Sequence, residues 1–214
     1  YPNDSSGTPH ILEHVVLCGS EKFPVHDPFF AMTRRSSNTF MNAFTAKLWT
    51  AYPAASKIEK DFYNLLNVYL DAVFHPRIEK TSFKQEGHRL EFSDPHDPTS
   101  ELMVKGIVYN EMKGAYANAG SIFWRKMMAI LYPNHTYGFD SGGDPKDITT
   151  LTHKGLCDFH KKFYDPSNPI FYFYGNLPLQ KHLDFIGNEI LDHAEKKETI
   201  PISSPNHSFY KTCL

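Results

Sequence analysis

The sequence predicts an α/β or α+β fold in which helices cover a sheet, and three observations support this. Segments with the three-to-four-residue apolar spacing of amphipathic helices alternate with short segments rich in aromatic and β-branched residues. The length of 214 residues and the hydrophobic fraction of 41% fit one large globular domain or slightly more. No internal repeat or low-complexity tract indicates a solenoid or disorder.

The first helix is predicted at residues 9–18. Thr8 suits the capping position, Pro9 suits the first helical position, and Gly19 marks the end of the helix. Residues 37–53 are rich in Thr, Phe, Trp and Tyr and show no helical spacing, so we expect two strands joined by a turn.

Helices and strands continue to alternate along the rest of the chain. A long amphipathic helix is predicted at 58–75, and short strands are predicted at 88–92 and 170–175. The second of these strands is aromatic and is expected to be buried. Residues 196–214 have no periodicity and are expected to form a tail beyond a domain of residues 1–195. The same helical spacing predicts further helices at 102–117, 121–131, 152–163 and 179–195.

Charge and cysteine content exclude several classes of protein. The net charge is −2, without the basic balance of a nucleic-acid-binding domain, so no nucleic-acid partner is expected. No run approaches the roughly 18 consecutive apolar residues of a membrane span, so none is expected. Three scattered cysteines are too few for a disulfide framework and indicate a reducing compartment.

The chemistry is concentrated in residues 10–14, His-Ile-Leu-Glu-His. Two histidines four residues apart on a helix, His10 and His14, lie on one face and suit a single metal ion. Glu13 lies beside them, where a carboxylate can take a proton from a metal-activated water. A chain with 12 histidines would contain only about 0.03 such inverted motifs by chance. Two surface histidines on an amphipathic helix are the alternative.

A catalytic zinc needs a third protein ligand, and Glu111 is the favoured candidate. On a helical projection of residues 102–117, Glu111 falls in the middle of the apolar stripe, where a buried carboxylate needs a cation. The alternative is a buried glutamate paired with Arg or Lys. Glu91 competes weakly because it lies beside Arg89 on the outer face of its strand, and Glu86 remains possible.

With these residues placed, the chain resembles the metallopeptidases of the pitrilysin/insulysin family, which carry the inverted zinc motif. Within that family it is most similar to the presequence protease and falcilysin branch. The matching segments are residues 7–14, 17–20, 38–45, 60–65, 105–114, 135–137 and 141–145.

The resemblance implies one Zn²⁺ per chain, held by His10, His14 and Glu111, with Glu13 as the general base. It also implies an antiparallel-rich sheet backed by helices. A strand containing Asn42, Ala43, Phe44 and Thr45 would pair with peptide substrates in extended conformation. The function implied is a zinc metalloendopeptidase that hydrolyses short unstructured peptides, such as cleaved targeting presequences, in the mitochondrial matrix.

Two departures from the family pattern affect this expectation. Family members have strands before the motif and further homologous domains after it. The chain is therefore expected to be an N-terminal module without its first strands, whose partner is the missing C-terminal half. Residues 203–211 resemble a segment that lies further downstream in the family, so the tail is expected to be joined from a later domain. The alternative function is a fragment that keeps the zinc site but does not cleave.

Overall fold

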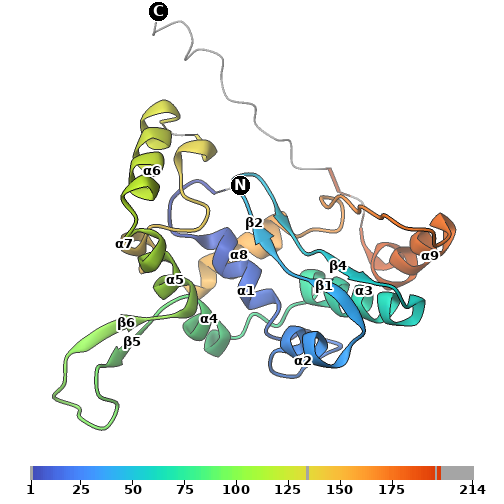
Figure 1. Cartoon of the computed structure of the whole chain (residues 1–214), viewed down its shortest axis with the longest axis horizontal. Coiled ribbons are helices and arrows are strands. Elements are labelled where there is room, and N and C mark those ends of the chain that lie inside the picture. The colour runs from blue at the N-terminus through green and yellow to red at the C-terminus, as the bar shows by residue number, and fades with distance from the viewer. Residues whose placement is uncertain (1, 134, 196, 199–214) are drawn as a thin grey trace, which may run out of the picture.

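The computed structural model describes residues 2–133, 135–195 and 197–198, and in these residues helices predominate over three two-stranded antiparallel sheets (Figure 1). The α-helices are α1 (Thr8–Val16), α2 (Pro28–Arg35), α3 (Glu59–Phe74), α4 (Lys80–Glu86), α5 (Ile107–Ala115), α6 (Ala119–Leu131), α7 (Pro145–Ile148), α8 (His153–Phe163) and α9 (Leu179–Glu189). The strands are β1 (Asn38–Met41), β2 (Phe44–Thr45), β3 (Thr50–Ala51), β4 (Ala54–Ser56), β5 (Arg89–Phe92) and β6 (Leu102–Lys105).

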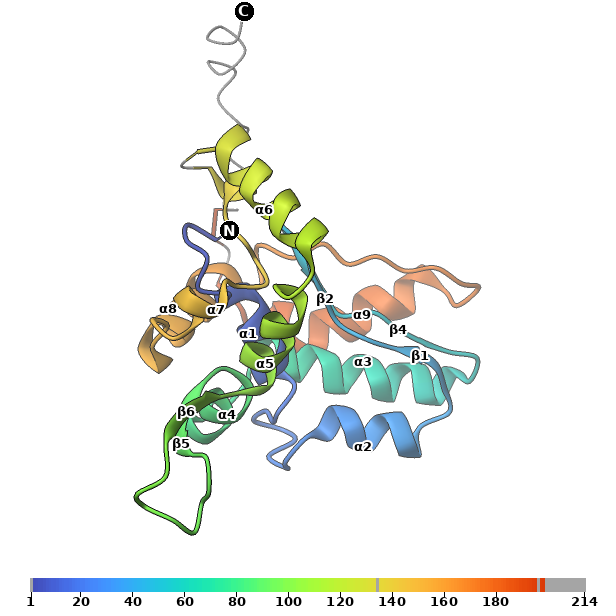
Figure 2. The ribbon, with the colours of Figure 1, turned by 60° about the vertical axis from the view of Figure 1, so that its left-hand side comes forward.

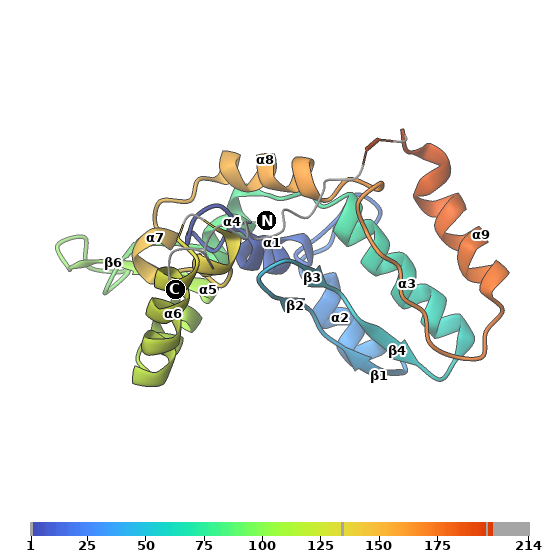
Figure 3. The same cartoon turned by 90° about the horizontal axis from the view of Figure 1, so that it is seen from above.

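The predicted α+β class with antiparallel pairing is confirmed, but the strands form three separate ladders rather than one sheet. β1 pairs with β4 and β2 with β3, so residues 38–56 form one interrupted hairpin, as the two-strand prediction required. The tip of this hairpin lies against α1 (Figure 3). The third ladder, β5 with β6, projects from the opposite side of the molecule (Figure 2).

The main core surrounds α1. Four residues of this helix, Ile11, Leu12, Val15 and Val16, are fully buried or nearly so. They pack with buried residues from the surrounding helices, so α1 is held on one face by α4, α5 and α8 (Figure 2). The other buried residues of this core are Ile78, Phe83, Val108, Met112, Ile148, Leu151 and Leu156.

The start of α1 differs from the prediction. Gly7, not Thr8, is the capping residue, with a φ of 70° in the left-handed region that glycine tolerates. A side chain at Gly7 would also approach the Gly142 carbonyl oxygen to 2.8 Å, so this close approach requires glycine. The predicted Thr8 cap is wrong, since no side chain caps the helix.

Residues 102–117 are not one helix as predicted. Residues 102–105 form β6, which pairs with β5 from Arg89–Lys105 to Phe92–Leu102, and the helix α5 begins only at Ile107. Gly106 lies between the two elements. The backbone passes so close to Gly87 here that a Cβ at residue 106 would lie 2.0 Å from the Gly87 carbonyl oxygen, so only glycine fits. The pairing of residues 102–105 with β5 and the close backbone contact at Gly106 therefore prevent the helix that the apolar spacing of residues 102–117 predicts.

The segment 170–175 was predicted to be a buried strand, and this prediction is wrong. It is assigned to no strand among the described residues. Phe171 and Phe173 pack against a second core formed by Leu70, Ile186 and Ile190, between α3 and α9. The alternate residues face outward, because nothing in the described chain covers that side: Ile170 is 95%, Tyr172 84% and Tyr174 93% exposed.

The helices α3, α6 and α8 agree with the predicted ranges within two residues at each end. The sequence pattern does not predict the short helices α2, α4 and α7. The last predicted helix ends at Glu189 and is followed by a 3₁₀ turn at Leu191–His193. No helix in the described part of the chain is long and apolar enough to cross a membrane. The predicted joined segment at 203–211 lies outside the described residues.

The core around α1 gives a stability prediction. Leu156 of α8 is fully buried there, so Leu156→Ala should lower the free energy of unfolding by about 2–5 kcal/mol through lost burial and a cavity. Urea denaturation monitored by circular dichroism would measure the change. The control Ile130→Ala, at a residue 75% exposed on α6, should change it by less than about 0.5 kcal/mol. Equal effects of the two substitutions would contradict this packing.

Candidate metal centre

His10 and His14 project from the same side of α1, away from its buried stripe. Their rings lie 5.0 Å apart between centroids in an edge-to-face arrangement. Four-residue spacing on a helix brings two side chains to this separation. Because the opposite face of α1 is anchored in the core, the positions of both imidazoles are set by the packing of the helix.

The Nδ1 atom of each ring has an oxygen partner. His10 Nδ1 lies 3.2 Å from the Gly142 carbonyl oxygen, and His14 Nδ1 lies 3.1 Å from Glu86 Oε2. A carbonyl and a carboxylate oxygen only accept hydrogen bonds, so in each neutral ring Nδ1 donates. This leaves a free electron pair on Nε2 of both histidines.

Glu111 of α5 completes a group of three donors. Its Oε1 lies 3.7 Å from His10 Nε2, and its Oε2 lies 4.0 Å from His14 Nε2. One ligand atom from each of the three residues lies within 4.8 Å of the others. Tetrahedral zinc with ligands at about 2.0–2.1 Å separates its donors by about 3.3 Å. The donor atoms are therefore slightly further apart than in a zinc site, and a small inward movement of the three side chains would bring them to zinc-binding distances.

The structure brings Glu111 to the histidines, although not for the predicted reason. Its side chain is 53% exposed, so the expectation that it faces the core is wrong. The helix begins at Ile107 rather than 102, and Val108 and Met112 are its buried residues. Glu111 lies on the side of α5 toward α1, where its carboxylate reaches both imidazoles and stays open to solvent.

The two competing carboxylates do not join this group. Glu91 accepts hydrogen bonds from Arg89 and from Lys105, as its predicted outer position beside Arg89 requires. Those partners hold the pKa of Glu91 below its ordinary value. Glu86 is near the site but contacts the Nδ1 side of His14, opposite the free Nε2.

Glu13 is buried beside the metal group and accepts a hydrogen bond from the Thr45 hydroxyl. The Thr45 hydroxyl also lies 3.3 Å from that of Thr50 on the paired strand. The family resemblance implies that Thr45 lies in a substrate-binding strand, but no pattern in the sequence predicts that its side chain contacts Glu13. The hairpin tip therefore orients the carboxylate that was predicted to be the general base.

Two tyrosines lie close to this carboxylate. The hydroxyls of Tyr52 and Tyr164 are 2.9 Å apart. Burial, followed by the influence of Tyr164 and the charge of Glu13, raises the pKa of Tyr52 well above its ordinary value. Burial also raises the pKa of Tyr164 to about 12. Both phenols are therefore protonated at neutral pH.

The pKa of His14 reflects competing influences. Burial lowers this pKa, but the hydrogen bond to Glu86 and the charges of Glu86, Glu13 and Glu111 outweigh burial and raise it above its ordinary value. Three carboxylates therefore act on one imidazole. An electrostatic environment of this sign favours a cation.

The loop 139–143 holds the carbonyl that contacts His10. Asp140 in this loop pairs with Arg125 and accepts a hydrogen bond of 2.9 Å from the Tyr116 hydroxyl. Burial alone would raise the pKa of Asp140, but Arg125 and Tyr116 hold it below its ordinary value. The loop therefore positions a candidate ligand, because its Gly142 carbonyl oxygen is the partner of His10 Nδ1.

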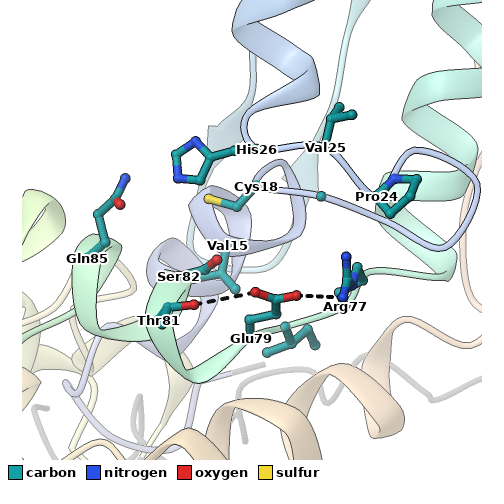
Figure 4. Close-up of a pocket in the computed structure, with 12 residues that line it drawn as sticks. Val15, Cys18, Pro24, Val25, His26, Arg77, Glu79, Thr81, Ser82 and Gln85 are labelled. Carbon is teal, nitrogen blue, oxygen red and sulfur yellow. Dashed lines mark hydrogen bonds and ion pairs between the residues drawn. The ribbon is translucent and has the colours of Figure 1, made fainter.

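A separate cavity of about 150 Å³ lies between the end of α1, α4 and the 18–26 loop (Figure 4). Val15, Cys18, Ser82 and Gln85 line it, and none of the three metal donors does. Burial raises the pKa of the Cys18 thiol, so the thiol stays protonated at neutral pH. Cys18 lies in this cavity, apart from the three-donor group.

Comparison with known proteins agrees with the motifs. The model of the insulinase family, peptidase family M16, matches residues 2–115, and the model of the M16 inactive domain matches residues 150–212. Two solved structures share the fold. A protease from Helicobacter pylori has a TM-score of 0.71 at 18% identity, covering 94% of this chain and 46% of that protein. The periplasmic protease PqqL from Escherichia coli has a TM-score of 0.65 at 14% identity, covering 96% and 21%.

Curated relatives are much closer in sequence. The mitochondrial presequence protease of Xenopus tropicalis is 52% identical over 94% of this chain, and that of Candida albicans is 47% identical over 99%. Protein HypA of Clostridium perfringens is 49% identical over 92%. The chain spans about one fifth of the length of each of these relatives. The chain therefore belongs to the insulinase family of peptidases, family M16, and within it to the presequence protease branch that its motifs predicted.

Proposed function

We propose that His10, His14 and Glu111 bind one Zn²⁺ and that the chain is the zinc-binding module of a metalloendopeptidase. The observation that carries this proposal is the convergence of the three donors within 4.8 Å of one another. Two imidazole nitrogens and one carboxylate oxygen suit zinc rather than calcium or magnesium, which prefer oxygen ligands. Three protein ligands also leave a position open, as in catalytic zinc sites.

Glu13 acts as the general base in this proposal. When bound, zinc lowers the pKa of a coordinated water and polarises the substrate carbonyl. A Glu13 carboxylate oxygen accepts the proton of the attacking water and passes it to the amine that leaves. The hydrogen bond from Thr45 orients this carboxylate, and burial excludes bulk water from it.

The edge of β2 supports an extended peptide as substrate. Among the described strands β2 pairs with β3 alone, which leaves its other edge open for a further strand. Asn42, Ala43, Phe44 and Thr45 would bind the peptide main chain there by β-augmentation, beside Glu13. Main-chain pairing accepts many sequences but requires an unfolded segment, so the substrates are short unstructured peptides.

The curated relatives suggest the substrates and the compartment. Those of Xenopus and Candida are named mitochondrial presequence proteases. By this similarity, the substrates of the present chain are cleaved targeting presequences, and its compartment is the mitochondrial matrix.

A second candidate function is zinc binding without cleavage. The chain spans about one fifth of the length of its relatives, so residues that assist catalysis could lie in the remaining part of a longer protein. In this case the C-terminal half is the required partner. Both candidates predict zinc binding, and only the first predicts cleavage by this chain.

The metal site is tested by zinc content. The purified chain should bind one zinc ion, and Glu111→Gln should abolish or strongly weaken binding because it removes the anionic oxygen donor. Elemental analysis after gel filtration would measure the stoichiometry. Glu91→Gln is the matched control and should keep a full equivalent, since Glu91 pairs with Arg89 and Lys105. Loss of zinc in Glu91→Gln, with zinc retained in Glu111→Gln, would show that Glu111 is not the third ligand.

The general base is tested by Glu13→Gln, which keeps the shape of the side chain and removes its basicity. Cleavage of a fluorogenic unstructured peptide should fall by about 10²–10⁴-fold while zinc content stays unchanged. The assay would use this chain and a longer form that carries the downstream segments. Activity in the longer form alone would support the second candidate for this chain. Undiminished cleavage by Glu13→Gln would exclude Glu13 as the base.

A further inference from the structure

Lys47 lies in the turn at the tip of the hairpin, between β2 and β3. The Ala46 amide donates to the Trp49 carbonyl oxygen at 2.8 Å, which closes this turn. A lysine at such a tip ordinarily extends into water. Lys47 is instead half-buried, and its Nζ donates to the carbonyl oxygen of Phe139. The hairpin tip is therefore attached to the loop 139–143, which is distant in sequence.

The loop that receives this hydrogen bond is itself held in place. The backbone amide of Asp140 donates to the Ser5 hydroxyl at 3.0 Å, and the Asp140 carboxylate accepts from the Tyr116 hydroxyl at 2.9 Å. A carbonyl oxygen of the same loop contacts His10 Nδ1. The loop therefore connects the hairpin tip to the helix that carries both candidate histidine ligands.

The surroundings of the Lys47 ammonium make this hydrogen bond important. Burial lowers the pKa of Lys47; the charge of Asp140 opposes this effect, and the charge of Arg125 adds to it. An ammonium that loses part of its water needs a hydrogen-bond acceptor in exchange. The Phe139 carbonyl oxygen supplies this acceptor, and hydrogen bonds from a charged donor are about twice as strong as neutral ones.

The hairpin tip is too short to be rigid by itself. β2 and β3 contain two residues each, and an isolated two-stranded ladder is at best marginally stable in water. Thr45 belongs to this short ladder, and its hydroxyl donates to Glu13. The position of the Thr45 hydroxyl on Glu13 therefore depends on how firmly the tip is held.

We propose that Lys47 is a positioning residue that fixes the hairpin tip to the loop 139–143 and so holds the Thr45 hydroxyl on Glu13. Its effect on cleavage rests on the proposed role of Glu13 as general base. The attachment of the tip does not rest on that role and is measured without cleavage.

Hydrogen exchange of the purified chain, followed by NMR, tests the attachment. Lys47→Met keeps the apolar stem and removes the ammonium, whereas Lys47→Arg keeps a cationic donor. The Ala46 amide, which closes the turn, should exchange about 10-fold faster in Lys47→Met, because one charge-assisted hydrogen bond is lost. Its rate should return toward that of the unaltered chain in Lys47→Arg.

The matched control is Lys126→Met, at an exposed lysine of α6, which should leave the Ala46 rate unchanged. An unchanged Ala46 rate in Lys47→Met would overturn the proposal. An equal acceleration at the Leu156 amide of α8 would also overturn it, since that result would show general destabilisation rather than release of the tip.

Steady-state cleavage of a fluorogenic unstructured peptide tests the link to Glu13, in this chain or in the longer form, whichever cleaves. Lys47→Met should lower kcat by about 10–100-fold and leave KM and zinc content unchanged, and Lys47→Arg should restore most of the loss. An unchanged kcat, or a rise in KM alone, would overturn the positioning of Glu13. Absence of cleavage by both unaltered forms would overturn the proposed function, and the exchange rates would still decide whether Lys47 holds the tip.

Discussion

Burial of one face of α1 fixes the orientation of both candidate histidine ligands. Ile11, Leu12, Val15 and Val16 fill the centre of the core, so α1 cannot rotate without exposing them. The same packing brings up the other groups of the site. α5 carries Glu111 toward the imidazoles, α4 carries Glu86 behind His14, and the hairpin tip carries Thr45 to Glu13.

The site is also an electrostatic arrangement that favours a cation. The charges of Glu13, Glu86 and Glu111 all raise the pKa of His14, against the opposing effect of burial. A divalent cation between the two Nε2 atoms and Glu111 would offset this negative charge. Basic side chains neutralise carboxylates elsewhere in the described chain, as Arg125 does for Asp140 and as Arg89 and Lys105 do for Glu91.

The sequence predicts the part of the site that lies within one helix, because the spacing of His10, Glu13 and His14 is a local property. The apolar spacing predicts Glu111 as a ligand but predicts a helix from residue 102, whereas α5 begins at Ile107 and the Glu111 side chain is half exposed instead of buried. The pairing of β6 and the open face of residues 170–175 depend on contacts distant in sequence. The support from Glu86 and Thr45 was missed for the same reason, since local periodicity does not report which side chains meet across elements.

The central claim is that two imidazoles and one carboxylate converge on a single zinc ion. X-ray absorption at the zinc edge of the metal-loaded chain tests it most directly. The account predicts only nitrogen and oxygen ligands at about 2.0–2.2 Å, with the outer-shell scattering of two imidazole rings. A sulfur ligand at about 2.3 Å, or a shell of oxygen without imidazole scattering, would contradict it.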